Sequence, residues 1–118
     1  MDRETNKILS VIVPTYNAEK FLDKGLSSFL VDDNSILNEI EVVVVNDGTP
    51  DNSVAVAQKY VDLYPNVFRI LNKKNGGHGS AINAGVGVIK GRYFKVVDAD
   101  DWVNTQILKE TVCYLKQH

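Results

Sequence analysis

The sequence predicts an α/β fold, an open and mainly parallel sheet with helices on both faces. Four short runs of β-branched and aromatic residues alternate with four amphipathic stretches. The runs show little polar alternation, which is typical of strands covered on both faces. Strands that alternate with helices favour right-handed crossovers and a parallel sheet. From the four strand runs, the three crossover helices and the position of the polar strand ends, we expect the strand order 3-2-1-4.

The predicted strands are short and apolar, and they comprise residues 8–13, 40–45, 67–71 and 93–97. Pro14 is expected to close the first strand, because proline has no N–H to donate to a sheet. Glu41 interrupts the apolar run of the second strand.

The first two helices follow the first two strands. Asn17 is expected to cap a helix whose apolar residues recur on one face as far as Leu30. Asp51 or Asn52 opens the second helix, and Pro65 stops it.

The third predicted helix spans residues 81–89, with Ser80 as its cap and Gly91 at its end. Gly85 and Gly87 each cost such a helix about 1 kcal/mol relative to alanine. We therefore expect this helix to pack close to the sheet, where small residues are useful. A fourth helix, Thr105 to Gln117, is expected to turn its apolar residues inward, namely Ile107, Leu108, Val112 and Leu115.

Composition limits the classes of protein. The chain has 118 residues, enough for one domain, and a net charge of −2 gives no basic excess for nucleic acid. Its apolar runs are far shorter than the ~20 residues that cross a bilayer. The polar residues 1–7 lack the apolar core of a signal peptide, so we expect a cytoplasmic protein. Cys113, the single cysteine, excludes an internal disulfide and is expected to be a partly buried, inert thiol.

Polar residues gather after each predicted strand. They form the segments Pro14–Asn17, Asn46–Asp51, Asn72–Ser80 and Asp98–Asp101. In an open α/β sheet, ligands bind outside the carboxyl ends of the strands. The sequence therefore predicts one ligand site at this edge of the sheet.

Three carboxylates fall within four residues, at Asp98, Asp100 and Asp101. Like charges this close repel one another unless a cation or hydrogen-bond donors lie among them. Oxygen ligands without cysteine suit Mg²⁺ or Mn²⁺. The alternative is a solvated turn in which one aspartate caps the next helix. Trp102 stands where an EF-hand loop would need a further ligand, which excludes that motif.

Two further segments have a functional and a purely structural interpretation. Asp47 is either the acid of an Asx-turn or a carboxylate that accepts an N–H from a planar base. The loop 75–80 leads into a helix N-terminus, which favours phosphate. It matches neither a Walker A loop nor a dinucleotide fingerprint. His78 is otherwise an exposed loop residue, and Lys73 and Lys74 are otherwise solvated.

Five motifs together resemble family 2 glycosyltransferases of the GT-A fold. They come in the family's order and spacing across residues 8 to 104, nearly the whole chain. The motifs are Val11–Asn17, Val42–Asn52, Asn75–Gly77 with Asn83–Gly85, Lys90–Tyr93 and Asp98–Trp102.

The resemblance implies transfer of a sugar, with inversion, from a nucleoside diphosphate, UDP above all, to a glycan, lipid or protein acceptor. It implies that Thr15 and Tyr16 border the nucleoside and that Asp47 contacts the base. Asp98 would then face the ribose and Asp100 a divalent metal, Mn²⁺ or Mg²⁺, with Asp98 also a metal ligand. The remaining residues expected to bind the nucleotide are Pro14, Asn17, Lys74, Gly77, His78, Asn83 and Ala99.

The chain departs from the family pattern in two residues. Asn46 stands where the family usually has a first aspartate, and Ile82 stands where it often has arginine. The second change removes a basic contact to the nucleotide, which Lys74 or His78 can replace.

The largest departure is length. Family members carry a second half with the acceptor site and a catalytic carboxylate, and no acid pair follows Trp102 here. The prediction is a single donor-binding domain, residues 1–118, truncated after the fourth strand and helix and belonging to a longer enzyme. Its general base is expected to lie outside the chain. A membrane attachment through segments outside the chain also stays open. An exposed edge beyond the fourth strand favours self-association.

Other functions fit the sequence less well. The alternative is a non-catalytic module that binds a nucleotide sugar or a metal. A sugar nucleotidyltransferase would need a glycine-rich loop with an arginine after the first strand, where this chain has Pro14–Asn17. A dehydrogenase would need its glycine fingerprint at the same place.

Overall fold

The computed structural model describes residues 7–118. The polar segment 1–6, on which the expected lack of a signal peptide largely rests, lies outside the described residues. One four-stranded sheet forms the centre, with all strands parallel and in the order β3-β2-β1-β4. The predicted fold class and strand order are confirmed. The strands are β1 (Leu9–Thr15), β2 (Ile40–Asp47), β3 (Phe68–Lys73) and β4 (Tyr93–Val96).

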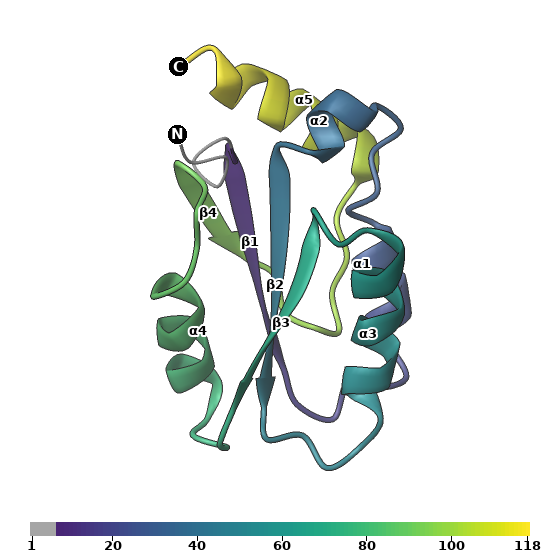
Figure 1. Cartoon of the computed structure of the whole chain (residues 1–118), viewed down its shortest axis with the longest axis vertical. Helices are drawn as coiled ribbons and strands as arrows, with labels where there is room; N and C mark the ends of the chain where they lie inside the picture. The colour runs from purple at the N-terminus through teal and green to yellow at the C-terminus, as the bar shows by residue number, and fades with distance from the viewer. Residues whose placement is uncertain (1–6) are drawn as a thin grey trace.

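Helices cover both faces of this sheet (Figure 1). The α4 helix lies on one face, and α1 and α3 lie on the other, while α2 and α5 lie near the amino ends of the strands. The helices are α1 (Leu22–Ser27), α2 (Asn34–Leu37), α3 (Ser53–Leu63), α4 (His78–Val86) and α5 (Thr105–Lys116). Along the described residues, none of them has both the length and the hydropathy to cross a membrane.

The two central strands explain the unbroken apolar runs. Alternate residues of a strand point to opposite faces, so Val42 and Val44 join the core under α1 and α3. Val43 and Val45 join a smaller core with Ile12 under α4. All of these side chains are buried, and each contributes about 1.5–3 kcal/mol. Because both faces are covered, the strands carry no polar alternation.

The first helix is shorter than predicted: of the stretch from Asn17 to Leu30, only α1 is helical. The chain instead forms a turn, the short helix α1, and after a further loop the helix α2. Asn17 does not cap a helix: it has a φ of 54°, in the left-handed region. Its N–H donates to Thr49, and the next two N–H groups donate to Ser53 and Asp51. These contacts tie the turn before α1 to the loop before α3.

The third helix begins and ends earlier than predicted. It starts at His78 rather than Ala81, because Gly77 adopts a φ of 96° and its carbonyl already accepts the Ala81 N–H at 3.0 Å. Ser80 therefore lies inside α4 and is not its cap. The expected close packing is confirmed: a Cβ atom on Gly85 would lie 2.6 Å from Ile12 Cγ2.

Smaller differences occur at the other boundaries. Pro14 does not close the first strand, since it pairs with Val45 inside β1 at a position that needs no N–H from it. In α5, Asn104 is the cap, and Leu108 and Val112 are buried as expected. Ile107 was wrongly expected to face inward and is 60% exposed. It shares its helical stripe with two exposed residues four and seven positions later, Thr111 and Tyr114.

Candidate functional site

A cleft of about 430 Å³ opens at the carboxyl ends of the strands. Each strand is followed by a segment that contributes to it, as the sequence predicts. Ten of the predicted site residues line the cleft, namely Pro14, Thr15, Tyr16, Asn17, Asp47, Gly77, His78, Asp98, Ala99 and Asp100. The lining also includes Asn75, from the predicted loop 75–80, and Ala18, Phe21 and Ala81, which the sequence did not single out for the site.

The segment after β1 supplies an aromatic wall. Thr15 is buried, and its hydroxyl donates to the Val13 carbonyl at 2.9 Å. Tyr16 is 49% exposed, and Phe21, from the turn before α1, is 52% exposed. Both rings line the cleft. An exposed ring of this kind can stack on a planar base.

Asp47, at the end of β2, is buried and forms the floor of the cleft. Its Oδ1 accepts hydrogen bonds from Lys73 Nζ and the Gly76 N–H, both at 2.9 Å. Its Oδ2 accepts one from the Gly77 N–H at 2.9 Å. Asp47 therefore ties the glycine loop, residues 74–77, to the end of the sheet.

These donors also set the charge of Asp47. The hydrogen bond from Lys73 is the largest influence, and with the Gly76 and Gly77 N–H groups it holds the pKa of Asp47 below its usual value. The carboxylate is therefore ionised at neutral pH. Oδ2 also accepts a longer hydrogen bond from Asn75 Nδ2, at 3.5 Å.

Two glycines, Gly48 and Gly77, allow the glycine loop to lie close to the end of β2. Gly48 has a φ of 67°, and a Cβ atom on it would lie 2.7 Å from the Asn75 backbone nitrogen. Asn75 in turn donates from Nδ2 to the Asp47 carbonyl at 2.9 Å. Gly77 has a φ of 96° and directs the chain into α4. The start of α4 is thereby set at the edge of the cleft.

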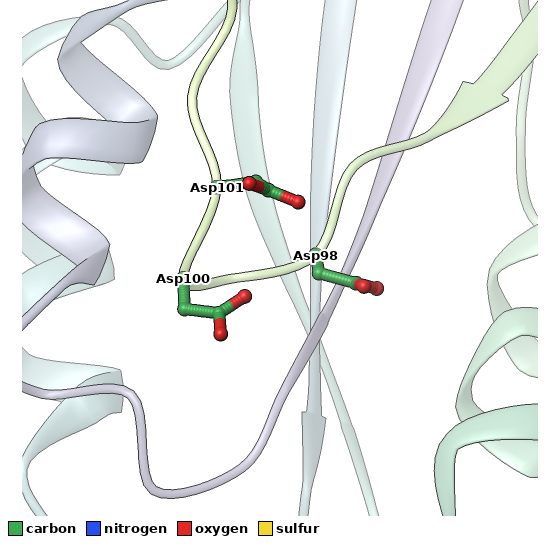
Figure 2. Close-up of side chains that lie close together, drawn as sticks. All are labelled: Asp98, Asp100 and Asp101. Carbon is green, nitrogen blue, oxygen red and sulfur yellow. The ribbon is translucent and has the colours of Figure 1, made fainter.

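The aspartate loop, residues 98–101, follows β4 (Figure 2). One oxygen from each of Asp98, Asp100 and Asp101 lies within 4.8 Å of the others, and all three residues are exposed. Such a set of carboxylate oxygens has the chemistry that Mg²⁺ and Mn²⁺ prefer. Across the cleft, His78 Nε2 lies 2.7 Å from Asp98 Oδ1.

The helix α1 supports the aspartate loop from behind. A Cβ atom on Gly25 would lie 2.6 Å from the Asp101 carbonyl oxygen, so the two backbones are nearly in contact. Ser28 Oγ accepts the Val103 N–H at 3.1 Å. Lys24 Nζ lies 3.5 Å from the centre of the Trp102 ring.

Lys74 and Asn83 lie outside the lining of the cleft: both are exposed, Lys74 in the glycine loop and Asn83 on α4. Lys73, for which solvation was the expected state, is instead paired with Asp47 and only 19% exposed. The signal for this pair is the strand register, because Asp47 and Lys73 face each other at the ends of β2 and β3. A sequence without known register does not show it.

Comparisons with known proteins agree with this architecture. The family model described as glycosyl transferase family 2 matches residues 10–118. The chain is 37% identical over 102 residues to the uncharacterized glycosyltransferase EpsJ of Bacillus subtilis (strain 168), covering 86% of this chain and 28% of that protein. It is 42% identical over 103 residues to the uncharacterized glycosyltransferase YibD of Escherichia coli (strain K12), covering 87% of this chain and 28% of that protein.

Solved structures of Staphylococcus aureus TarS, residues 1–349, are similar over 94% of this chain. The complex with UDP gives a TM-score of 0.81 at 30% identity, and the complex with UDP-GlcNAc gives 0.79 at 31%. This chain covers 32% of each of those chains. It therefore spans about a third or less of the length of the proteins that it resembles.

Proposed function

Because this chain belongs to glycosyl transferase family 2, we propose that its cleft binds the nucleotide of a nucleoside-diphosphate sugar, with UDP as the preferred nucleotide. The observation that carries the proposal is the convergence of four strand ends on one cleft. The aromatic wall and the buried carboxylate suit a base. The backbone N–H groups at the helix start and the carboxylate cluster suit a ribose and a diphosphate. The TarS complexes with UDP and UDP-GlcNAc support the choice of nucleotide.

The base would lie between the aromatic wall and Asp47. Tyr16 offers an exposed ring for stacking. The contact of Asn75 Nδ2 with Asp47 Oδ2 is long, so that oxygen can accept a stronger hydrogen bond from an N–H in the plane of the base. Uracil has such an N–H at N3, whereas cytosine has an acceptor there. This difference favours UDP over CDP.

The ribose and diphosphate would occupy the side of the cleft towards β4. Asp98 can accept a hydrogen bond from a ribose hydroxyl, and the start of α4 at Gly77 and His78 favours negative charge. Asp100 and Asp98 would hold Mn²⁺ or Mg²⁺, which would neutralise the diphosphate leaving group. The residues of this chain thus bind and orient the donor.

The acceptor and the general base belong, in this proposal, to other parts of a longer enzyme. Among the described residues, the carboxylates that line the cleft are Asp47, Asp98 and Asp100, and each is assigned to the donor. A glycan, lipid or protein hydroxyl would need a separate base to attack the sugar with inversion. Residues 1–118 would therefore act as a donor-binding domain. The half-buried, unpaired Cys113 is compatible with a reducing compartment such as the cytoplasm.

The proposal predicts metal-dependent binding of UDP. Asp100→Asn removes an anionic ligand, so we expect at least about a 10-fold loss of UDP affinity in the presence of Mn²⁺. Removal of the metal with EDTA is expected to weaken UDP binding to the unaltered chain. Its UDP affinity should then equal that of the variant. Isothermal titration calorimetry measures both effects.

Asp62→Asn is the matched control, because Asp62 is an exposed carboxylate on α3 that accepts a hydrogen bond from Gln58, away from the cleft. It is expected to bind UDP as the unaltered chain does. Failure of the unaltered chain to bind UDP with or without metal would contradict the proposed function. Equal affinities of the unaltered chain and Asp100→Asn in Mn²⁺ would contradict the role of Asp100.

A further inference from the structure

A side-chain pair bridges the two sides of the cleft. His78 is the first residue of α4, and Asp98 follows β4 by two positions. The imidazole Nε2 lies 2.7 Å from Asp98 Oδ1, a short distance for a hydrogen bond of this kind. Both residues line the cleft, with side chains 61% and 50% exposed. The contact is therefore within reach of any ligand that enters.

The pair restrains a carboxylate that would otherwise be free to rotate. Asp98 has exposed carboxylate neighbours, and their oxygens lie within 4.8 Å of one another, so mutual repulsion favours rotamers that move them apart. A donor on Oδ1 opposes that repulsion. With Nε2 engaged on Oδ1, Oδ2 is the oxygen that remains for a ligand hydroxyl.

We infer that His78 is a positioning residue, which holds the Asp98 carboxylate ready for the ribose of the donor nucleotide. This inference rests on the proposed function of the same cleft. His78 acts through Asp98 and need not touch the nucleotide itself. A pair this exposed contributes little to folding. Its effect therefore belongs in ligand affinity and not in thermal stability.

Three variants test this role by calorimetric titration with UDP, once in EDTA and once in Mg²⁺. His78→Leu removes the donor, and we expect about a 10-fold weaker affinity in both conditions, by analogy with the loss of other orienting partners. His78→Gln can place its amide Nε2 near the same position and is expected to restore most of the affinity. His118→Gln, at the other histidine of the chain, is the matched control and is expected to change nothing. Melting temperatures of all variants are expected to agree with that of the unaltered chain.

A double-mutant cycle with Asp98→Asn tests whether His78 affects UDP affinity through Asp98. If His78 acts through Asp98, His78→Leu is expected to cause little further loss in the Asp98→Asn background. An equal loss in both backgrounds would overturn the inference, as would unchanged affinity of His78→Leu or failure of His78→Gln to restore it. Absence of UDP binding by the unaltered chain would instead contradict the proposed function itself.

Discussion

Asp51 is a residue whose carboxylate holds two loops together. Its Oδ1 accepts hydrogen bonds from the hydroxyls of Thr49 and Ser53, at 2.7 and 2.6 Å, and its Oδ2 accepts the Glu19 N–H at 3.1 Å. Burial raises the pKa of Asp51, but the hydrogen bonds from Ser53, Thr49 and Glu19 outweigh it and lower the pKa to about 2. Asp51 thus fixes the turn before α1 against the loop before α3.

This lowered pKa predicts a pH-dependent contribution to stability. A carboxyl group with a lower pKa in the folded state stabilises the fold above its unfolded pKa, near 4, and loses this contribution as the pH falls towards 2. Asp51→Asn is therefore expected to lower the free energy of unfolding by about 1–2 kcal/mol at pH 7, a value reduced for partial exposure. The difference from the unaltered chain should shrink between pH 4 and pH 2. Urea unfolding at several pH values measures it, and a difference independent of pH would contradict this account.

Among the elements, the strands were more predictable than the helices. Their apolar runs are long enough to identify, and a parallel sheet buried on both faces leaves few alternatives for them. The helix predicted from Asn17 to Leu30 forms only at Leu22–Ser27, and the turn before it is held by the N–H groups of residues 17–19, which bond to side chains more than thirty positions away. Local pattern carries no information about such contacts.

The site residues also include some that the sequence predicts and some that it does not. The residues that follow the strands could be predicted, since topology brings the strand ends to one edge. Phe21 could not, because its place in the cleft depends on the turn before α1. The partner of Lys73 depends on the register between β2 and β3. Residue propensity and sequence spacing determine neither the course of such a turn nor the register between two strands.

The element α1 offers a direct test of how the aspartate loop is held. Gly25→Ala would place a Cβ atom 2.6 Å from the Asp101 carbonyl oxygen, so α1 or the loop must shift. We expect a loss of stability of about 1–3 kcal/mol and a weaker response of UDP affinity to Mn²⁺. Chemical unfolding and calorimetry give the two values.

Gly79→Ala is the control for this substitution, because no atom lies within 4 Å of a Cβ atom at Gly79. There, in the first turn of α4, the higher helix propensity of alanine is expected to leave stability unchanged or raise it by up to about 1 kcal/mol. If both variants behaved alike, close contact between α1 and the aspartate loop would not be the cause.

For the molecule as a whole, the sheet has an uncovered edge at β4. In the described part of the chain this strand pairs with β1 alone, and Phe94 within it is 50% exposed. Further large apolar side chains are exposed after it, namely Trp102, Ile107 and Tyr114. A free strand edge with exposed apolar residues promotes association between chains.

We therefore predict that this chain self-associates as its concentration rises. Phe94→Lys is expected to weaken that association by placing a charge on the edge strand. Analytical ultracentrifugation measures the change. Leu63→Lys, at the exposed end of α3, is the control, because it also replaces an exposed apolar side chain with lysine. If Leu63→Lys weakened association as much as Phe94→Lys, association would not depend on the β4 edge.

The position of β1 between β2 and β4 has a consequence for the order of folding. Leu9 pairs with Ile40 on one side and with Tyr93 on the other, so β1, the earliest of the four described strands in the chain, receives its second neighbour last. Contacts between residues this far apart in sequence slow folding. During synthesis, β1, β2 and β3 can assemble with Asp47 and the glycine loop before β4 is available. The aspartate loop follows β4, so the half of the cleft expected to hold the ribose and diphosphate would form after the half that β1, β2 and β3 build.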